Sequence, residues 1–285
     1  PWGRWSYSRL VERSASPGVA ERSGREEEGF DPDHSGPPEQ AGPGETASAE
    51  TEAWAALPGG ASFGTLVHSI LEQLDYSADP AASEGQQIIR TAVARSGLDP
   101  SLEGPLLPAL VELLQRPLGG PLGSTSLASI ARGDSVRELA FDLPISGFEG
   151  GPQRDILGEA LEQLSRHPNP LLQSYAAQRL GPRRPQLSAG FLNGVIDLVF
   201  RHRSGSGATQ WVVLDWKTNR LHKPVTSIMA AKDYWLQAQL YRQAVQLWLR
   251  RRLGLAAAEP FAVQAVMLFT RSGEGAWLLD PGDQR

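Results

Sequence analysis

An apolar segment that ends in charged residues constrains this chain more than any other feature of its sequence. Residues 211–217 read WVVLDWK, so an apolar run stops at Asp215, Trp216 and Lys217. Side chains two positions apart on a strand point to the same face and lie roughly 6–7 Å apart. We therefore expect Asp215 and Lys217 to project together from the end of a buried strand.

A second carboxylate lies in the preceding apolar segment. Asp197 interrupts the run VIDLVF within residues 190–202, where a charge is costly unless it is paired or bound to a metal. The segments 190–202 and 210–217 are joined through the sequence SGSG, which predicts an antiparallel hairpin. In such a hairpin Asp197 can lie next to Asp215.

Two carboxylates and a lysine on adjacent strands suit phosphodiester hydrolysis. Carboxylate oxygens hold a hard divalent cation, and an ammonium group can steer or deprotonate the attacking water or stabilise developing charge. Each feature alone also has an ordinary structural interpretation, because an Asp-x-Lys sequence is often a surface pair and a single strand aspartate is often a turn or bulge residue. Two carboxylates and a lysine together on adjacent apolar strands are harder to explain without a catalytic or metal-binding site.

The other periodicities predict an α/β fold with a central mixed β-sheet flanked by helices. Apolar residues at helical spacing indicate an amphipathic helix at 63–75, and further helical segments are expected at 84–96, 102–115, 154–180 (interrupted by prolines) and 227–253. Alternating apolar residues predict strands at 138–145 and 262–270, the latter being the last expected element.

Composition separates the start of the chain from this folded part. Residues 14–52 are rich in Gly, Pro, Ser, Glu and Ala, and such a segment cannot bury enough apolar surface to offset its ordering entropy. We predict that residues 1–53 are a largely disordered tether and that residues 54–285 fold. The chain has no cysteine, which excludes disulfides and iron–sulfur clusters. No apolar run approaches the roughly 20 residues of a membrane span, so we expect a cytoplasmic protein without a membrane partner.

Four ordered motifs resemble the PD-(D/E)xK nuclease superfamily and, within it, the C-terminal nuclease domain of RecB-like helicase–nucleases. They are PGGASFGTLVHSILEQLDY, which is similar to the family's G-x-x-x-H helix, then GVIDLVF, VVLDWKTN and YWLQAQLYRQAV. The sequence RELAFDLPI also resembles the strand that follows the first helix. The resemblance implies a restriction-endonuclease-like fold, with residues 54–285 as the nuclease domain and residues 1–53 as the tether from an upstream helicase.

The resemblance also implies a role for each matching residue. The magnesium ligands would be His68, Asp197 and Asp215. Lys217 would be the catalytic lysine, and Gln237 and Tyr241 would line the site and orient the lysine or a DNA phosphate.

Two further residues near the site have simpler interpretations. From its helix alone, His68 is better interpreted as a core histidine, and only the motif reverses this. Glu138 begins its strand, and a solvated strand end is favoured over a supporting role in the site.

The implied activity is that of a deoxyribonuclease of the exodeoxyribonuclease V type, which would hydrolyse DNA phosphodiesters with Mg²⁺ during double-strand-break processing and recombinational repair. The implied partners are single- and double-stranded DNA, RecC-like and RecD-like subunits, and RecA. No G-x-x-x-x-G-K-[ST] motif occurs, so ATP would act only through an upstream helicase region absent from this chain.

Three alternatives stay open. The first is a nuclease of another branch of the superfamily, either AddA-like, which also carries a helicase upstream, or Cas4-like. The second is an inactive nuclease fold that serves as a DNA-binding or subunit-docking module. The third is a nuclease that folds but cuts poorly when it is separated from its helicase. The intact residues Asp197, Asp215 and Lys217 argue against the second alternative, because a fold without activity has no physical reason to keep unpaired charges in its sheet.

Overall fold

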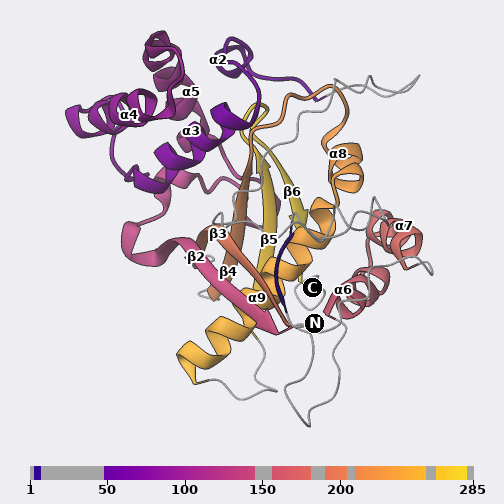
Figure 1. Cartoon of the computed structure of the whole chain (residues 1–285). Coiled ribbons are helices and arrows are strands. Elements are labelled where there is room, and N and C mark those ends of the chain that lie inside the picture. The colour runs from indigo at the N-terminus through magenta and orange to yellow at the C-terminus, as the bar shows by residue number, and fades with distance from the viewer. Residues whose placement is uncertain are drawn as a thin grey trace.

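A single mixed sheet with helices on both faces organises the molecule (Figure 1). The structure is a computed structural model that describes residues 3–7, 48–144, 156–180, 190–203, 209–254 and 261–280. Within these ranges, no helix is both long enough and apolar enough to cross a membrane. The predicted α/β class is confirmed.

The strands of the described residues form one six-stranded sheet in the order β1-β3-β4-β5-β6, and β2 also pairs with β3. The pairs β1–β3 and β4–β5 are parallel, whereas β2–β3, β3–β4 and β5–β6 are antiparallel. The predicted hairpin is therefore confirmed as β3–β4. The strands are β1 (Gly3–Ser6), β2 (Ser135–Pro144), β3 (Gly190–Arg203), β4 (Thr209–Lys217), β5 (Ala262–Phe269) and β6 (Glu274–Leu278).

Strands β1 and β4 follow one another along the same edge of β3. Residues 190–193 of β3 pair with β1, residues 198–203 pair with β4, and β2 occupies the opposite edge over residues 191–200. Among the described residues, positions 194–197 thus have no strand partner on the edge that β1 and β4 share. This gap in the sheet contains Asp197.

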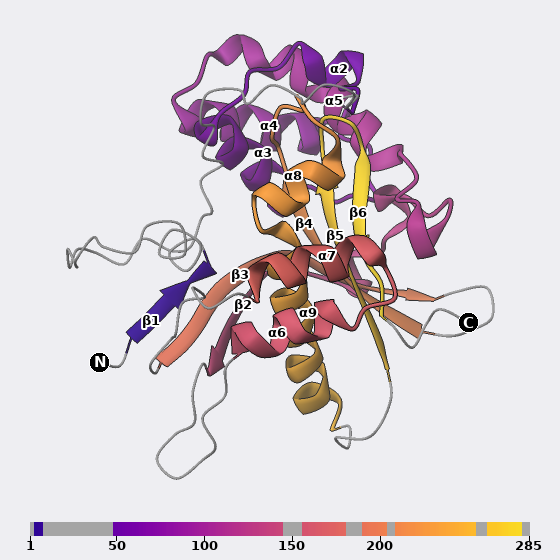
Figure 2. The same ribbon diagram turned by 90° about the vertical axis from the view of Figure 1, so that its right-hand side faces the viewer.

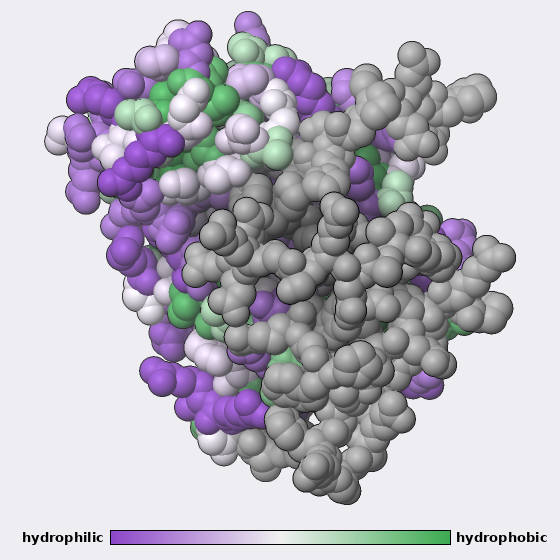
Figure 3. Space-filling model, viewed as in Figure 1, coloured by the Kyte–Doolittle hydropathy of each residue, from purple (hydrophilic) through white to green (hydrophobic). Residues whose placement is uncertain are grey.

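The sheet separates two hydrophobic cores (Figure 2). Helices α2 (Glu52–Ala55), α3 (Ala61–Gln73), α4 (Ser83–Ser96) and α5 (Glu103–Gln115) pack on one face. The other face is covered by α6 (Ile156–Ser165), α7 (Pro170–Arg179), α8 (Val225–Ala231) and α9 (Tyr234–Leu253). Short 3-10 turns lie at Pro100–Leu102, Gly120–Leu122, Leu127–Ser129 and Arg132–Asp134. Hydrophilic and apolar residues are interspersed on the outer surface of the α3–α5 lobe, at the upper left of Figure 3.

The prediction of one helix over 227–253 is wrong, because the chain breaks between α8 and α9. Asp233 lies at the break with a φ of 56°. Its carboxylate accepts hydrogen bonds from Tyr175 Oη and Arg179 Nε, each at 2.7 Å, and its carbonyl accepts one from Tyr7 Oη at 2.5 Å. These three partners come from distant segments, so tertiary contacts impose a turn on a sequence whose local preference is helical.

The prediction that 262–270 is the last element is also wrong. Strand β6 follows β5 after a short turn and pairs with it from Phe269↔Glu274 to Ala265↔Leu278. Its five residues, EGAWL, are too few to show a clear alternation.

Parts of the predicted tether contact the folded body. Strand β1 joins the sheet, and Glu50 accepts hydrogen bonds from the Leu221 amide at 3.0 Å and from Arg271 at 3.3 Å. Residues 8–47 lie outside the described residues. The tether over 1–53 and the domain boundary at residue 54 remain predictions.

Candidate active site

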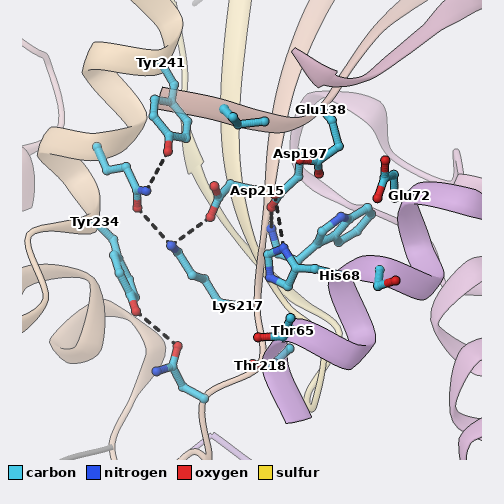
Figure 4. Close-up of a pocket in the computed structure, with 16 residues that line it drawn as sticks. Thr65, His68, Glu72, Glu138, Asp197, Asp215, Lys217, Thr218, Tyr234 and Tyr241 are labelled. Atoms are coloured by element: carbon cyan, nitrogen blue, oxygen red, sulfur yellow. Dashed lines mark hydrogen bonds and ion pairs between the residues drawn. The ribbon is translucent and has the colours of Figure 1, made fainter. Parts of the chain in front are cut away.

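A pocket of about 210 Å³ opens at the gap in the sheet (Figure 4). It brings together the six residues that the motifs selected, namely His68, Asp197, Asp215, Lys217, Gln237 and Tyr241. The other lining residues are Gly64, Thr65, Ser69, Glu72, Glu138, Val195, Trp216, Thr218, Asn219 and Tyr234. The lining therefore comes from α3, from three strands and from α9.

The ammonium group of Lys217 lies at the centre of the polar contacts in this pocket. Its Nζ is 2.8 Å from Asp215 Oδ2 and 2.9 Å from Gln237 Oε1. The Nε2 of Gln237 in turn donates to Tyr241 Oη at 3.0 Å. A charged amine at 6% exposure is costly to bury alone, and these contacts compensate for much of that cost.

Burial works against the charge on Asp215. Desolvation raises the pKa of this carboxyl to about 6, the Lys217 ammonium opposes the rise, and the negative charge of Asp197 adds to it. Apart from the ion pair with Lys217, no well-directed hydrogen bond within the described residues reaches Oδ2 of Asp215. The pocket therefore holds a buried carboxylate oxygen that a further positive charge would stabilise.

Asp197 connects β4 to the helix α3. Its Oδ2 accepts a hydrogen bond from the Trp216 amide at 2.7 Å, and its Oδ1 lies 3.2 Å from Nδ1 of His68. Burial lowers the pKa of His68, but the charge of Asp197 and its hydrogen bond, together with the charge of Asp215, outweigh this and leave the pKa raised. His68 thus lines the pocket beside a carboxylate and does not belong to the hydrophobic core.

The side-chain alternation of β3 changes at Asp197. Leu192 and Ile196 pack into the core beneath α6–α9, whereas Leu198 and Phe200 pack into the core beneath α2–α5, although all four positions are even-numbered. A regular strand would keep these positions on one face. The change of face lets Asp197 meet His68 of α3, while Asp215 and Lys217 lie on the side of α9.

Comparison with known proteins agrees with this arrangement. A sequence profile of the PD-(D/E)XK nuclease superfamily matches residues 45–274. The chain belongs to this superfamily.

Relatives of this PD-(D/E)XK nuclease include three proteins named RecBCD enzyme subunit RecB. The protein of Mycobacterium tuberculosis strain H37Rv is 33% identical over 96% of this chain and 26% of its own length. That of Mycolicibacterium smegmatis is 31% identical over 88% of this chain and 24% of its own length, and that of Escherichia coli K12 is 30% identical over 75% and 17%. The chain therefore spans about a quarter or less of these relatives.

Glu138 is a residue of this nuclease pocket that the sequence undervalued. It is an exposed residue that, like Asp197, is skipped by the β2–β3 pairing between Arg137↔Leu198 and Leu139↔Ile196. Its backbone has a φ of 49°, and its carboxyl lines the pocket near those of Asp197 and Glu72 (Figure 4). Partial desolvation, and then the charges of Asp197 and Glu72, raise the pKa of Glu138 to about 7. Glu138 is thus exposed, as the sequence suggested, but it lies inside β2 rather than at its start, and it lines the pocket. The sequence carries no signal for the positive φ that turns this residue.

Gly64 shows why the first motif of the superfamily contains glycine here. A Cβ at this position would lie 2.9 Å from Oγ1 of Thr218, which follows strand β4. Real Cβ contacts are not that short, so a larger residue would require either the Thr218 hydroxyl or helix α3 to shift. Gly64 thus allows the close approach of helix and strand.

PD-(D/E)XK nucleases generally use divalent metal ions, and the donor chemistry of the pocket fits such an ion. Two buried carboxylates and one imidazole supply oxygen and nitrogen ligands. His68 and Asp197 contact each other and Asp215 pairs with Lys217. Within the described part of the chain, no group of three His, Asp or Glu side chains is already arranged as a metal-ligand set. The predicted set of three ligands therefore remains a proposal.

Proposed function

We propose that this chain is the magnesium-dependent DNA nuclease domain of a RecB-like helicase–nuclease. The observation that supports it most is the buried Lys217 ammonium held between Asp215 and Gln237, at the strand gap that also contains Asp197. Two carboxylates at one opening can bind a divalent cation, and the lysine beside them can supply a positive charge or transfer a proton. Hydrolysis of a phosphodiester needs both functions.

His68, Asp197 and Asp215 would hold the cation. Bound there, it would polarise the scissile phosphate and lower the pKa of a coordinated water. Hard cations such as Mg²⁺ prefer oxygen ligands and bind few protein side chains, and the described pocket offers mainly carboxylates and hydroxyls. Magnesium therefore suits this donor set.

Lys217 would act next to the reacting phosphate. Its ammonium can stabilise the negative charge that develops on the phosphoryl oxygens, or take part in moving a proton from the attacking water. Gln237 fixes the position of Nζ, and Tyr241 holds the Gln237 amide in the orientation that presents its oxygen to the lysine. In this proposal one set of residues binds the cation, and a different pair, Gln237 and Tyr241, orients the ammonium group of Lys217.

Because the relatives are named as the RecB subunit of a RecBCD enzyme, we extend the proposal to a larger assembly. We propose an activity of the exodeoxyribonuclease V type on single- and double-stranded DNA in double-strand-break processing, with RecC-like and RecD-like subunits and RecA as partners. ATP would act through a helicase region that precedes this domain in the complete protein.

Cleavage of a labelled single-stranded oligonucleotide tests the proposal. We expect the purified chain to cut in Mg²⁺ and to stop in EDTA, and we expect Asp215→Asn to lose the activity. Asp142→Asn, which changes an exposed aspartate of β2 outside the pocket lining, should cut like the wild type. Cleavage that persists in EDTA or in Asp215→Asn, or no cleavage by a folded chain, would refute the assignment.

A further inference from the structure

Tyr234 contacts the proposed catalytic lysine, Lys217, although the sequence motifs gave this tyrosine no role. It is the first residue of α9 and is 6% exposed, and its ring centroid lies 3.9 Å from Nζ of Lys217. Figure 4 shows Lys217 reaching between Tyr234 on one side and Asp215 on the other. We propose that Tyr234 is a positioning residue that holds the Lys217 ammonium with its ring face, an inference that rests on the proposed nuclease function.

The ring supplies a kind of support that the other two contacts do not. A flexible lysine needs several contacts to keep one position, and the face of an aromatic ring attracts a cation without neutralising it. The Asp215 carboxylate would share its charge with a bound metal ion, so its hold on the ammonium would weaken in the loaded enzyme. The neutral contacts, from Gln237 and the Tyr234 ring, would then fix Nζ.

Tyr234 is itself held in place from several directions. Its hydroxyl donates to Asn219 Oδ1 at 3.3 Å, and its ring lies against that of Phe269 with the centroids 6.4 Å apart. Asn219 lies two residues after Lys217, so the start of α9 and the end of β4 are joined both by the ring–ammonium contact and by this hydrogen bond. A ring that is fixed at its hydroxyl and at one edge can position the lysine.

The turn between α8 and α9 determines where this tyrosine lies. Asp233 precedes it in the left-handed region, a conformation that its bonds from Tyr175 and Arg179 support. The break in the predicted helix at Asp233 thus comes immediately before the residue whose ring enters the pocket. Because Asp233 and Tyr234 are joined by one peptide bond, the backbone turn at Asp233 sets where the Tyr234 ring begins.

The chain offers a test that does not depend on cleavage, because lysine occurs only at Lys217, Lys223 and Lys232. In protein labelled with ¹³C at the lysine ε-carbon, we expect three signals, with that of Lys217 identified by its loss in Lys217→Met. The ring current of Tyr234 should move the ε-protons of Lys217 upfield. This displacement should remain in Tyr234→Phe and disappear in Tyr234→Leu, while the other two signals stay in place.

Kinetics test whether the placement matters for the reaction. We expect kcat of Tyr234→Leu to fall roughly tenfold or more, the scale of a desolvated cation–π contact, with little change in KM for DNA. Phenylalanine at this position should rescue most of the rate. Phenylalanine with one, two and three ring fluorines, which weaken the negative ring face with little change of shape, should lower kcat stepwise, and this series replaces the leucine variant if that variant does not fold.

Three results would overturn the inference. They are an unmoved Lys217 signal in the wild type, an upfield signal that persists in Tyr234→Leu, or equal loss of kcat in the phenylalanine and leucine variants. A wild type that shows the upfield signal but does not cut DNA would instead refute the nuclease function, so the two failures can be told apart.

Discussion

At the scale of single residues, the pocket contains two carboxyl groups, those of Glu138 and Asp215, whose charged forms are disfavoured by burial. Glu138 adopts a φ of 49°, which costs an L-residue about 1 kcal/mol or more. Its carboxyl also has a pKa raised to about 7, by partial desolvation and by the charges of Asp197 and Glu72. Such costs are typical of functional sites, where geometry is kept at the expense of stability.

We predict that Glu138→Gly stabilises the metal-free protein, because glycine adopts a positive φ without strain and removes one acidic group. The raised pKa means that the folded state disfavours the charged form. The stability contribution of Glu138 is thus complete below its unfolded pKa of about 4.5 and is lost as the pH rises through about 7. The gain in Tm should therefore be larger at pH 8 than at pH 4.

The matched control for this prediction is Asp142→Gly, in the same strand. Asp142 has no positive φ and lies outside the pocket lining, so glycine should lower stability by roughly 0.5–1 kcal/mol there. Thermal unfolding at the two pH values measures both variants. A loss of Tm for Glu138→Gly at pH 8 similar to that of the control would contradict the argument.

Residue identity alone selected several of the residues that line the candidate pocket, and the reason is chemical. Asp197, Asp215 and Lys217 are conspicuous because charges are rare within apolar strands. Tyr234 gave no such signal, since an aromatic residue at the start of an amphipathic helix is ordinary. For Glu138 the sequence favoured a position outside the site for a different reason, because the direction of this side chain depends on a backbone conformation that the sequence does not show.

At the scale of elements, a buried arginine joins the two segments that carry the site. Arg271, 0% exposed, follows β5 and donates from Nε to the Thr218 carbonyl and from Nη1 to the Trp54 carbonyl, each at 2.9 Å. The third guanidinium nitrogen, Nη2, donates to the Pro58 carbonyl. Thr218 follows strand β4, which carries Asp215 and Lys217, and Pro58 precedes the helix that carries His68, so Arg271 holds these two ends together.

We predict that Arg271→Met lowers the free energy of unfolding by about 3–5 kcal/mol, the usual cost of breaking a buried charged network. The loss arises because the buried Thr218 and Trp54 carbonyls and the Glu50 carboxylate would each lose one of the groups that they contact. Urea unfolding measures it, with Arg252→Met, an exposed arginine at the end of α9, as the control. A change below about 1 kcal/mol for Arg271→Met would show that the network does not hold the two ends together.

The elements themselves were predictable where one face of a regular pattern is buried. The periodicities placed α3, α4, α5 and the β3–β4 hairpin near their observed positions, because burial requires a period of 3.6 or 2 residues. The α8–α9 break was not predictable, since Asp233 is turned by Tyr175 and Arg179 from another helix. The pairing of β1 with β3 was hidden as well, because its partner lies nearly 190 residues away.

At the scale of the whole molecule, the sheet brings residues from both of its faces to one opening. His68 comes from a helix on one face, Gln237 and Tyr241 come from a helix on the other, and Asp197 and Asp215 lie in the sheet between them. The gap between β1 and β4 along β3 makes this possible, because a continuous strand there would separate the two sides. The pocket thus depends on an interruption of the sheet.

The same arrangement assigns different roles to the carboxylates and to the lysine. The carboxylates would bind the cation, whereas Lys217 would act on the phosphate without being required for cation binding. Removing the lysine should therefore leave the metal bound and stop the reaction, and removing Asp215 should abolish both.

Calorimetric titration of Mg²⁺ into the wild type, Asp215→Asn and Lys217→Met, with cleavage rates on the same samples, tests this division most directly. We predict that Lys217→Met binds Mg²⁺ at least as well as the wild type but cuts about 10²–10⁴-fold more slowly, and that Asp215→Asn neither binds nor cuts. Normal Mg²⁺ binding by Asp215→Asn, or near-normal cleavage by Lys217→Met, would contradict the account.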